Sequence, residues 1–561
     1  MTELLTTIAI IFVIAGPFLL LASVTRLPTA PALIGAGLVA GFFVDETLKL
    51  EIARLGIALL VFTFAVRIQP TDVQHAIGDG EVTALWQLGV VGAVGSGLGL
   101  LLGLAPEYAL YLGIAATLSS SIVGSTLFLA RGQDLVHDRL SESIHAVQDF
   151  VGLVVLLVIS AGAFALEPIA TQIGYGVLLL VAAIAINRYC FDQLGRYLGA
   201  PTEAMLVGTI ALLLVFLGAS EELGLSIVVG AFAAGLAVHR DAVRYAGVVN
   251  GLDSLNDFFA AIFFITVGAL VTWPSIDVVA MTAVLVVLAA VLKPAVTVAL
   301  LMHRGYERRT ATLTGLNLDQ IGEFALIIAI EALFLGLVLE SVFEAIILAA
   351  AITLVTASVT RHYDEELYHW LANLGVLGRH GRSVDRWSEV PETMDDHVVI
   401  VGYGRHGRRL VRACEAHDQP YVVIESNPAV LEDLQAECSA FVLGDVVESR
   451  TVQRAGLTDA RLVISTADSR PVNERVVAFA DAVDVVVRTK GRESAREFLD
   501  RGAAYVAVSD LLAADRLEER FAELIAGEFD RDELVREVRD RLVGDVGLPR
   551  VDAGVSPGES D

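Results

Sequence analysis

Lysine is almost absent from this chain, and cysteine is scarce. Of its 39 basic residues only three are lysines, Lys49, Lys293 and Lys490, and the formal net charge at pH 7 is -27. A chain this acidic is not expected to bind nucleic acid, whose phosphates attract basic proteins. Three scattered cysteines are too few for a disulfide framework or a metal cluster, and they fit a reducing cytosol. Dense carboxylates with so little lysine indicate a halophilic protein, which works in concentrated salt, although an acidic cytosolic domain alone is the alternative.

Long apolar stretches are plentiful. Hydrophobic residues make up 55% of the 561 residues, and the apolar segments end near residue 372. About thirteen stretches approach the ~20 residues that a helix needs to cross a bilayer, the first at 4–24 and the last at 341–360. The pattern predicts a multi-pass α-helical membrane domain over residues 1–372, surrounded by membrane lipid.

Basic residues in the loops between these stretches are concentrated on one side of the membrane. If the loops are assigned alternately to the two sides of a membrane, one set carries twelve arginines and the other only Lys49 and Arg54. The second set carries acidic residues instead. By the positive-inside rule, this alternation places the N-terminus outside the cell and the C-terminal region in the cytosol of a cell (plasma) membrane protein.

The sixth stretch contains Gln148 and Asp149, which an ordinary transmembrane helix does not tolerate. A carboxylate at membrane depth costs at least ~2.5 kcal/mol even on lenient insertion scales, so it persists only where it pairs, binds a cation or faces water. Asp149 is therefore the predicted ion site, and it indicates transport of a cation or a proton.

The fifth and twelfth stretches hold polar interruptions, and in the eleventh Lys293 precedes Pro294, which should kink the helix. Discontinuous helices in corresponding halves are typical of transporters built from inverted repeats, with an ion site where the two broken helices cross. Stretches 4, 5 and 6 lie seven positions before 11, 12 and 13, and this odd separation gives opposite orientation. The polar residues are Ser119, Ser120 and Ser121 in the fifth stretch and Asp319, Gln320 and Glu323 in the twelfth.

A glycine fingerprint follows a polar linker at 373–396. The run from His397 combines a short apolar segment, the pattern G-x-G-x-x-G and a helix-compatible segment, the order of a dinucleotide site. Gly402 permits a tight turn, Gly404 lets the backbone approach a pyrophosphate, and Gly407 allows close packing of helix on strand. A second apolar run ends in Glu425, 21 residues after Gly404, where a carboxylate suits a ribose hydroxyl and disfavours NADP. A merely structural turn is the alternative.

Strand and helix patterns continue to alternate through residues 397–512, which predicts a Rossmann-like parallel sheet. The glycines, Glu425, Gly444-Asp445 and Thr466-Ala-Asp468 resemble the regulator of potassium conductance, or TrkA N-terminal, domain. The resemblance implies a regulatory nucleotide, NAD, NADH, AMP or ATP. Residues 513–561 are expected to form a charged helical segment and a disordered acidic tail. The residues assigned to the nucleotide are Gly402, Gly404, Arg405, His406, Gly407, Glu425, Asp445 and Thr466.

The membrane part resembles the monovalent cation:proton antiporter-2 family, most closely its Kef-type potassium/proton branch. The resemblance is carried by Ser119-Ser-Ser, Gln148-Asp149, Phe263 to Gly268, Lys293 and Gln320 to Phe324. It implies that the aspartate at 149 binds cation and proton alternately, and that Gln148 replaces an acid found in electrogenic sodium exchangers. The resemblance therefore implies exchange of K⁺ for protons, or electroneutral exchange, with Na⁺ as the second possible cation. It also implies a homodimer through both regions.

We hypothesise competition at one site, where Asp149 either coordinates a partly dehydrated cation, with Gln148 and the hydroxyls at 119–121, or carries a proton. Lys293 would neutralise the empty carboxylate, and a structural ion pair is the alternative for these two residues. Asp319 departs from the family pattern, and it either alters ion preference or pairs with Lys293 or Arg67.

Two other classes lack their required features. A nucleotide-gated cation channel, the alternative function, would need filter loops resembling Thr-Val-Gly-Tyr-Gly, and none is present. A nicotinamide oxidoreductase would need a substrate domain, and the residues after 512 are too few and too charged to form one. The chain is therefore expected to be a transporter and not an enzyme.

Overall fold

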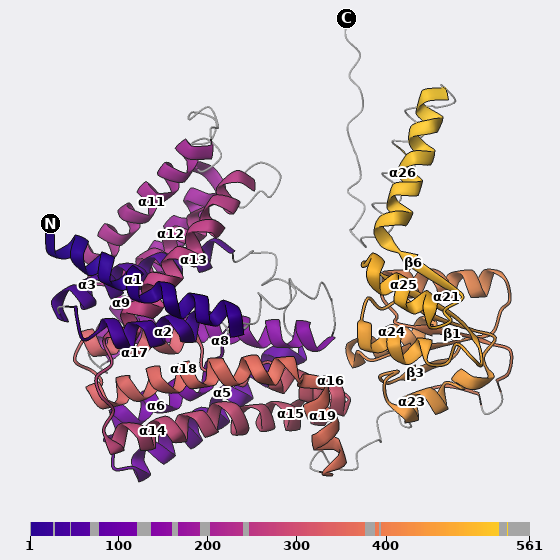
Figure 1. Cartoon of the computed structure of the whole chain (residues 1–561), viewed down its shortest axis with the longest axis horizontal. Helices are drawn as coiled ribbons and strands as arrows, with labels where there is room; N and C mark the ends of the chain where they lie inside the picture. Colours follow the sequence, from indigo (N-terminus) through magenta and orange to yellow (C-terminus); the bar gives the residue numbers. More distant parts are fainter. Residues whose placement is uncertain are drawn as a thin grey trace, which may run out of the picture. The chain divides into compact units, whose positions relative to one another are not determined.

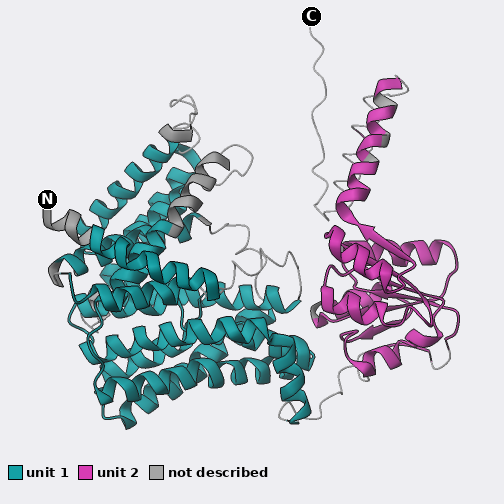
Figure 2. Ribbon diagram, viewed as in Figure 1, with its two compact units in different colours: residues 1–378 teal, residues 379–561 magenta. Residues whose placement is uncertain are grey.

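The computed structural model (Figure 1) describes residues 2–25, 29–44, 46–67, 78–120, 136–159, 166–190, 202–238, 246–375, 388–391, 394–526 and 536. The chain divides into two compact units, residues 1–378 and 379–561 (Figure 2). Each unit has its own buried apolar core.

Unit 1 is helical within the described ranges. Six segments are long and apolar enough to cross a membrane by length and composition, and four shorter apolar helices accompany them among those residues. The predicted multi-pass membrane fold is therefore confirmed. The elements are α1 (Thr2–Thr25), α2 (Thr29–Ala40), α3 (Glu46–Arg67), α5 (Asp79–Leu101), α6 (Pro106–Thr117), α8 (Val136–Ile159), α9 (Leu166–Ala185), η1 (Ile186–Cys190), α11 (Thr202–Glu222), α12 (Ile227–Ala237), α13 (Ala246–Ala269), α14 (Ile276–Val287), η2 (Leu288–Leu292), α15 (Lys293–His303), α16 (Arg308–Leu316), α17 (Glu323–Phe334), α18 (Glu340–His362) and α19 (Asp364–Asn373).

The helices of unit 1 pack in two groups (Figure 1). The first contains α1, α2, α3, α9, α11, α12 and α13, and the second contains α5, α6, α8 and α14 to α18. Small residues permit close contact between α2 and α13, since a Cβ on Gly37 would lie 2.0 Å from the carbonyl oxygen of Ile265. The second group holds both interrupted stretches, the fifth (α6) and the twelfth (α16 and α17). It also contains the stretches before them, α5 and α14 to α15, and the stretches after them, α8 and α18.

Both predicted interruptions are visible where the chain is described. In the twelfth stretch a non-helical segment at 317–322, which begins with a turn and ends with an extended residue at Gly322, separates α16 from α17, and it is called the second extended segment below. In the fifth, α6 ends at Thr117 and the chain is extended at 118–120, while Ser121 lies outside the described residues. In the eleventh, a π-helical turn, η2, precedes Lys293 and Pro294. Proline has no N–H to donate, so a wider turn accommodates the missing bond.

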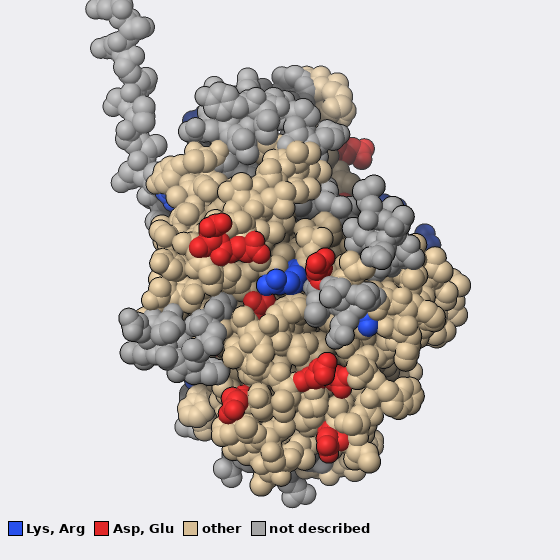
Figure 3. Space-filling view, turned by 90° about the vertical axis from the view of Figure 1, so that its left-hand side faces the viewer, with Lys and Arg blue, Asp and Glu red and all other residues tan. Residues whose placement is uncertain are grey.

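One face of the molecule is mostly apolar and sparsely basic. Figure 3 looks onto the side that lies at the left in Figure 1, and acidic side chains outnumber basic ones there. The loops assigned to the outside of the membrane include exposed Glu107, Glu222 and Glu340.

Unit 2 contains a six-stranded parallel sheet of order β3-β2-β1-β4-β5-β6, as the strand and helix alternation predicted. Successive residues of β1 enter two different cores, Val399 on one face and Ile400 on the other, because both faces of a parallel sheet are covered. The strand order reverses at β1 and β4, where ligands of such folds bind beyond the carboxyl ends. The elements are β1 (Val398–Val401), α21 (Arg405–Ala416), β2 (Tyr421–Glu425), η3 (Pro428–Val430), α22 (Leu431–Glu437), β3 (Phe441–Leu443), α23 (Ser449–Arg454), η4 (Leu457–Asp459), β4 (Leu462–Ser465), α24 (Arg470–Val477), β5 (Asp484–Thr489), α25 (Arg492–Asp500), β6 (Tyr505–Val508) and α26 (Ser509–Ala526).

The end of the predicted linker pairs with the edge of this sheet. Glu389 and Phe441 exchange two backbone hydrogen bonds, of 2.9 and 2.8 Å, and Leu443 N donates to Ser388 Oγ at 3.0 Å. The linker is thus fastened to β3, the strand that leads into Gly444 and Asp445. At the other end of unit 2, α26 begins at Ser509, a few residues before the expected helical segment.

Candidate functional site

Two extended segments cross within the second helix group. Gly322 N donates to the carbonyl oxygen of Leu118 at 3.0 Å, and Ser119 Oγ donates to that of Leu318 at 3.1 Å. A Cβ on Gly322 would lie 2.3 Å from the carbonyl oxygen of Ser119, so a side chain at 322 would force the backbones apart. The broken helices of the two halves therefore cross in direct contact, as the inverted-repeat pattern predicted.

Lys293 is completely buried at this crossing. Its Nζ donates to the carbonyl oxygens of Gln320, at 2.7 Å, and Leu118, at 3.4 Å. The carbonyl of Leu118 directly follows the C-terminal end of α6, where the helix dipole leaves partial negative charge that stabilises a cation, and that of Gln320 lies between α16 and α17. The hydrogen-bond acceptors of the ammonium among the described residues are thus backbone carbonyls, and neutralisation of Asp149 by Lys293 stays a prediction.

Helix α8 brings Gln148 and Asp149 to the first extended segment. The side chain of Gln148 is fully buried, its Oε1 accepts a hydrogen bond from Ser119 N at 2.9 Å, and its Nε2 donates to Gln87 Oε1 at 2.7 Å. Asp149 follows it along the helix and is 8% exposed. The amide of Gln148 thus fixes the broken helix in place, and buried Asp149 is the next residue of α8.

The second extended segment carries Gln320 and Glu323, both buried. Gln320 Nε2 donates to the carbonyl oxygens of Ser120, at 3.2 Å, and Asn317, at 3.3 Å, which ties the two segments together again. Glu323 is the first residue of α17, where the partial positive charge of a helix N-terminus favours a carboxylate.

Asp319 is buried on the same segment, where the charge of Lys293 acts on it, and the side chain of Arg67 lies outside the described ones. The charge of Arg361 also acts on it. Arg361, in the last turn of α18, donates to the carbonyl oxygen of Asn317 at 3.0 Å. Lys293 and Arg361 are thus the cations that compensate the extra acid.

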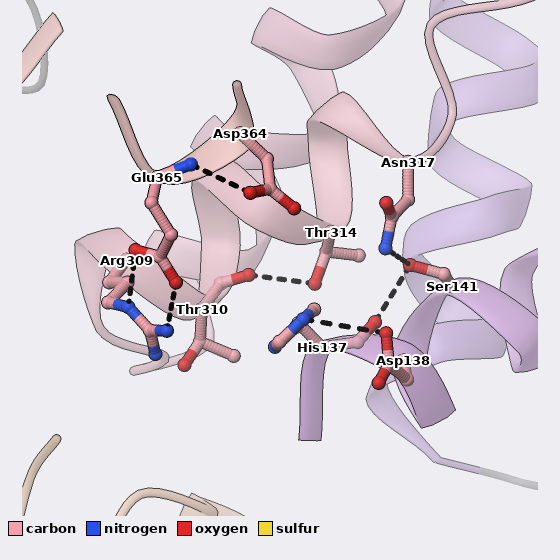
Figure 4. A network of polar contacts seen from close by, with 9 residues as sticks. All are labelled: His137, Asp138, Ser141, Arg309, Thr310, Thr314, Asn317, Asp364 and Glu365. Carbon is pink, nitrogen blue, oxygen red and sulfur yellow. Dashed lines mark hydrogen bonds and ion pairs between the residues drawn. The ribbon is translucent and has the colours of Figure 1, made fainter. Parts of the chain in front are cut away.

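Helix α16 is fastened at both of its ends (Figure 4). Near its start, the buried guanidinium of Arg309 pairs with Glu365 of α19, with Nε to Oε2 at 3.1 Å. Just past its end, Asn317 Nδ2 donates to Ser141 Oγ of α8 at 3.2 Å. These two contacts join the region of α16 to α19 at one end and to α8 at the other.

Sequence reasoning missed Gln87 and Thr353. Gln87 of α5 is fully buried between Gln148 and the first extended segment, while Thr353 Oγ1 of α18 accepts from Ile321 N at 3.1 Å. Gln87 is the one amide side chain of α5, and Thr353 is one of several hydroxyl residues of α18. The only available signal was the cost of burying a glutamine in a membrane span.

The three glycines of the fingerprint in unit 2 serve different purposes. Gly402 has φ of +96°, and a Cβ on it would lie 2.7 Å from Thr466 Oγ1. A Cβ on Gly407 would lie 1.9 Å from the carbonyl oxygen of Gly402, so α21 packs directly on the turn. A Cβ on Gly404 would meet no atom within 4 Å. The turn and the packing explain Gly402 and Gly407, and the open space at Gly404 leaves room for a ligand.

Glu425 reaches the glycine loop from the end of β2. Its Oε2 accepts a hydrogen bond from Tyr403 N at 2.7 Å, and its Oε1 accepts one from Asn427 N at 2.8 Å. The carboxylate is therefore oriented by backbone donors at the place where a ribose would lie.

The other predicted nucleotide contacts follow neighbouring strands. Thr466 Oγ1, after β4, donates to the carbonyl oxygen of Val401 at 3.0 Å, and Asp445, after β3, is buried. Arg405 and His406 are exposed at the start of α21. All of them lie beyond the carboxyl ends of parallel strands, so the fold gathers them at one edge of the sheet.

One side of the glycine loop is closed by Tyr403. Its hydroxyl donates to Glu437 Oε2 at 2.6 Å, and the guanidinium of Arg408 lies 4.6 Å from the centre of its ring. Burial, followed by the bond to Glu437, raises the pKa of the Tyr403 phenol well above its usual range, which keeps it a neutral donor.

Comparisons with known proteins agree with both units. The family model described as "Sodium/hydrogen exchanger, transmembrane" matches residues 8–362, and that of the TrkA-N domain matches residues 398–509. A protein named as a cation/proton antiporter, YbaL of Escherichia coli (strain K12), is 27% identical over 555 residues, which cover 94% of this chain and 99% of that protein. One named as a K⁺ efflux antiporter, KefB of Alkalimonas amylolytica, is 26% identical over 487 residues, 83% of this chain and 72% of that protein. The solved sodium proton antiporter MjNhaP1 from Methanocaldococcus jannaschii aligns with 67% of this chain and all of its own, at 15% identity and a TM-score of 0.48.

Proposed function

This chain belongs to the sodium/hydrogen exchanger family and carries a TrkA-N domain after its membrane part, and on that premise we propose that it exchanges K⁺ for protons at Asp149 under the control of a nucleotide. Na⁺ is the second candidate cation. The coarser activity, cation/proton antiport, follows from the family and from relatives named for it.

The burial of Asp149 beside the crossing is the observation that carries the proposal. It is 8% exposed, next to a glutamine whose two polar atoms are already hydrogen bonded. A buried carboxylate must be neutralised by a proton or a cation. Because the same carboxylate binds either one, binding of the cation releases the proton, and antiport follows.

Lys293 supplies a fixed charge near the site. Its ammonium compensates one carbonyl of each extended segment, so these carbonyls do not attract the transported cation on their own account. Asp149 is thus the group that binds the transported cation or the proton.

Alternating access would come from movement of the second helix group against the first. The crossing lies wholly within the second group, which includes α5 and α15 besides the broken helices. The hydrogen bonds of the crossing can therefore persist while the group moves, and only contacts between the groups have to change.

Two observations favour K⁺. The neutral Gln148 stands where the resemblance implies an acid in electrogenic sodium exchangers, and a relative matching 83% of this chain is named as a K⁺ efflux antiporter. We place the protein in the cell membrane with unit 2 in the cytosol, because the arginine-rich loops lie on the side of the C-terminal region.

Two fastened segments support regulation by a nucleotide. The linker end at 388–391 is paired with β3, which leads into Asp445 at the carboxyl edge of the sheet. At the start of the connection, α19 is paired through Glu365 with Arg309 of α16. A nucleotide at the glycine loop can bias transport only if it favours one conformer of this connection.

The proposal is tested with the full chain in liposomes that contain a pH dye. KCl or NaCl is added to wild type, to Asp149→Asn, and to Glu344→Gln, with and without NAD or AMP. Glu344 is a matched control because it is a buried membrane carboxylate that accepts a hydrogen bond from Thr272 N at 2.8 Å, away from the crossing.

We expect cation-driven proton movement in wild type and Glu344→Gln and none in Asp149→Asn. The salt that gives the larger response identifies the cation, and a nucleotide that changes the rate identifies the regulator. An uncompensated cation current without proton movement would contradict antiport and favour the gated channel.

A further inference from the structure

A ring of hydrogen bonds closes around the first extended segment of unit 1. The carbonyl oxygen of Thr117 accepts from Gln87 Nε2 at 3.2 Å, Gln87 Oε1 accepts from Gln148 Nε2 at 2.7 Å, and Gln148 Oε1 accepts from Ser119 N at 2.9 Å. Thr117 and Ser119 are two residues apart, so the backbone through Leu118 completes the ring.

Every member of the ring is buried. Gln87 and Gln148 are 0% exposed, and Ser119 and Thr117 are nearly so. Each glutamine uses both its oxygen and its nitrogen within the ring, so neither amide is left without a partner, as burial requires. The ring also satisfies a carbonyl and an N–H that the broken helix would otherwise leave unpaired.

The ring orients the residue that it surrounds. With Thr117 and Ser119 both tied to glutamines, the carbonyl of Leu118 points to the crossing, where it accepts hydrogen bonds from Gly322 N and Lys293 Nζ. The ring also fixes α8 at Gln148, the residue before Asp149. These three hydrogen bonds therefore set the position of α8 at Gln148, and with it the start of Asp149, relative to the crossing.

In the second half of the inverted repeat, Lys293 takes the place that Gln87 has in the first half. There Lys293, from the stretch before the broken helix, donates to the carbonyl oxygen of Gln320, and Thr353, from the stretch after it, accepts from Ile321 N. Gln87 and Gln148 make the corresponding contacts in the first half. The helix before each break thus supplies a donor, neutral in one half and charged in the other.

We propose that Gln87 is a positioning residue for the cation site at Asp149. It acts through Gln148 and Thr117, by setting the geometry of the first break, and it does not touch the cation. This inference rests on the proposed function, since it assigns Gln87 a role in the exchange that Asp149 performs. A merely structural Gln87 would stabilise the fold without affecting how tightly the folded protein binds its cation.

The test compares wild type, Gln87→Leu and Gln87→Glu in the same liposome assay, with the thermal stability of each purified protein measured in parallel. Gln172→Leu is the matched control, because Gln172 of α9 also donates to a backbone carbonyl, that of Gly224 at 3.3 Å, but in the first helix group. The readouts are KM for K⁺, kcat and their dependence on pH.

Gln87→Leu removes both bonds, and we expect KM for K⁺ to rise about tenfold, which corresponds to about 1.4 kcal/mol, with a smaller change in kcat. Gln172→Leu should leave KM unchanged. In Gln87→Glu the protonated carboxyl can still donate to Thr117 and the ionised one cannot, so exchange should fall as the pH rises. The elements that meet at the ring also carry titratable groups, and the wild-type profile accounts for their own titration: Asp79 and Glu81 of α5, His145 and Asp149 of α8, Lys293 of α15 and Glu323 of α17.

An unchanged KM in a folded Gln87→Leu protein would overturn the inference and leave the proposed function intact. If Gln87→Leu does not fold, the pH profile of Gln87→Glu decides, and a profile that coincides with that of the wild type would overturn it. If wild type itself exchanges no cation for protons, the proposed function fails, and the role of Gln87 fails with it.

Discussion

At the scale of single residues, Gly404 and Gly407 are expected to have different roles. Gly404 leaves room for a ligand, and Gly407 allows α21 to pack on the turn. A Cβ on Gly407 would lie 1.9 Å from the carbonyl oxygen of Gly402, whereas one on Gly404 meets nothing and fits its backbone, with φ of -77°. We expect Gly407→Ala to destabilise unit 2 by roughly 1–3 kcal/mol, the usual cost of overpacking. Gly404→Ala should keep its stability and lose about tenfold in nucleotide affinity, or about 1.4 kcal/mol.

Thermal unfolding and calorimetric titration of the full chain with NAD and AMP measure the two effects. Equal nucleotide affinity in Gly404→Ala and wild type would show that the glycine loop has only a structural role.

Residues that the sequence predicted were those in dense local patterns. The glycine fingerprint and Glu425 are close in sequence, and Gln148-Asp149 is a polar pair in an apolar run. Gln87 and Thr353 could not be found in this way, because their contacts lie 61 and 32 residues away in the sequence. The carbonyl partners of Lys293 were equally hidden, since backbone groups leave no mark in a sequence.

At the scale of elements, the crossing depends on one glycine. Gly322 has an extended backbone that alanine can adopt, with φ of -88° and ψ of 169°, but its Cβ would lie 2.3 Å from the carbonyl oxygen of Ser119. We expect Gly322→Ala to force the two broken helices apart, at a cost of roughly 1–3 kcal/mol, and to abolish exchange.

The measurement is exchange in liposomes, and Gly89→Ala on α5 is the control, because a Cβ there meets no atom within 4 Å. Wild-type exchange by Gly322→Ala would mean that close contact at the crossing is not required.

The broken helices were predictable because glycine and polar residues interrupt an apolar run at the same place in both halves. Pro294 likewise predicted a distortion, and the π-helical turn η2 is its observed form. The pairing of α16 with α19 was not predictable, because Arg309 and Glu365 are 56 residues apart and each is an ordinary charged residue near a membrane surface.

At the scale of the whole molecule, the coupling of the two units should depend on α19. Glu365 pairs with Arg309, whereas its neighbour Glu366 is exposed. We expect Glu365→Gln to retain exchange without nucleotide but to reduce the nucleotide-dependent change in rate by about fivefold, at the lower end of allosteric couplings. Glu366→Gln should respond as wild type does.

Exchange rates with and without NAD or AMP test this coupling. A full nucleotide response in Glu365→Gln would exclude α19 as the connection.

The division of the chain was evident from composition, since apolar stretches stop near residue 372 and the units separate at 378. The position of the linker end could not be predicted, because it pairs with β3 through backbone hydrogen bonds, which any extended residues can form.

The scarcity of lysine gives the buried ammonium at the crossing a practical use. Lys293 is 0% exposed, and the other two lysines lie far away in the sequence, at 49 and 490. An amine-directed acylating reagent should therefore spare Lys293 in the closed protein and label it only when water enters the crossing. Peptide mass spectrometry of the labelled chain would then follow the opening of the transport path at one atom, against a background of very few competing sites.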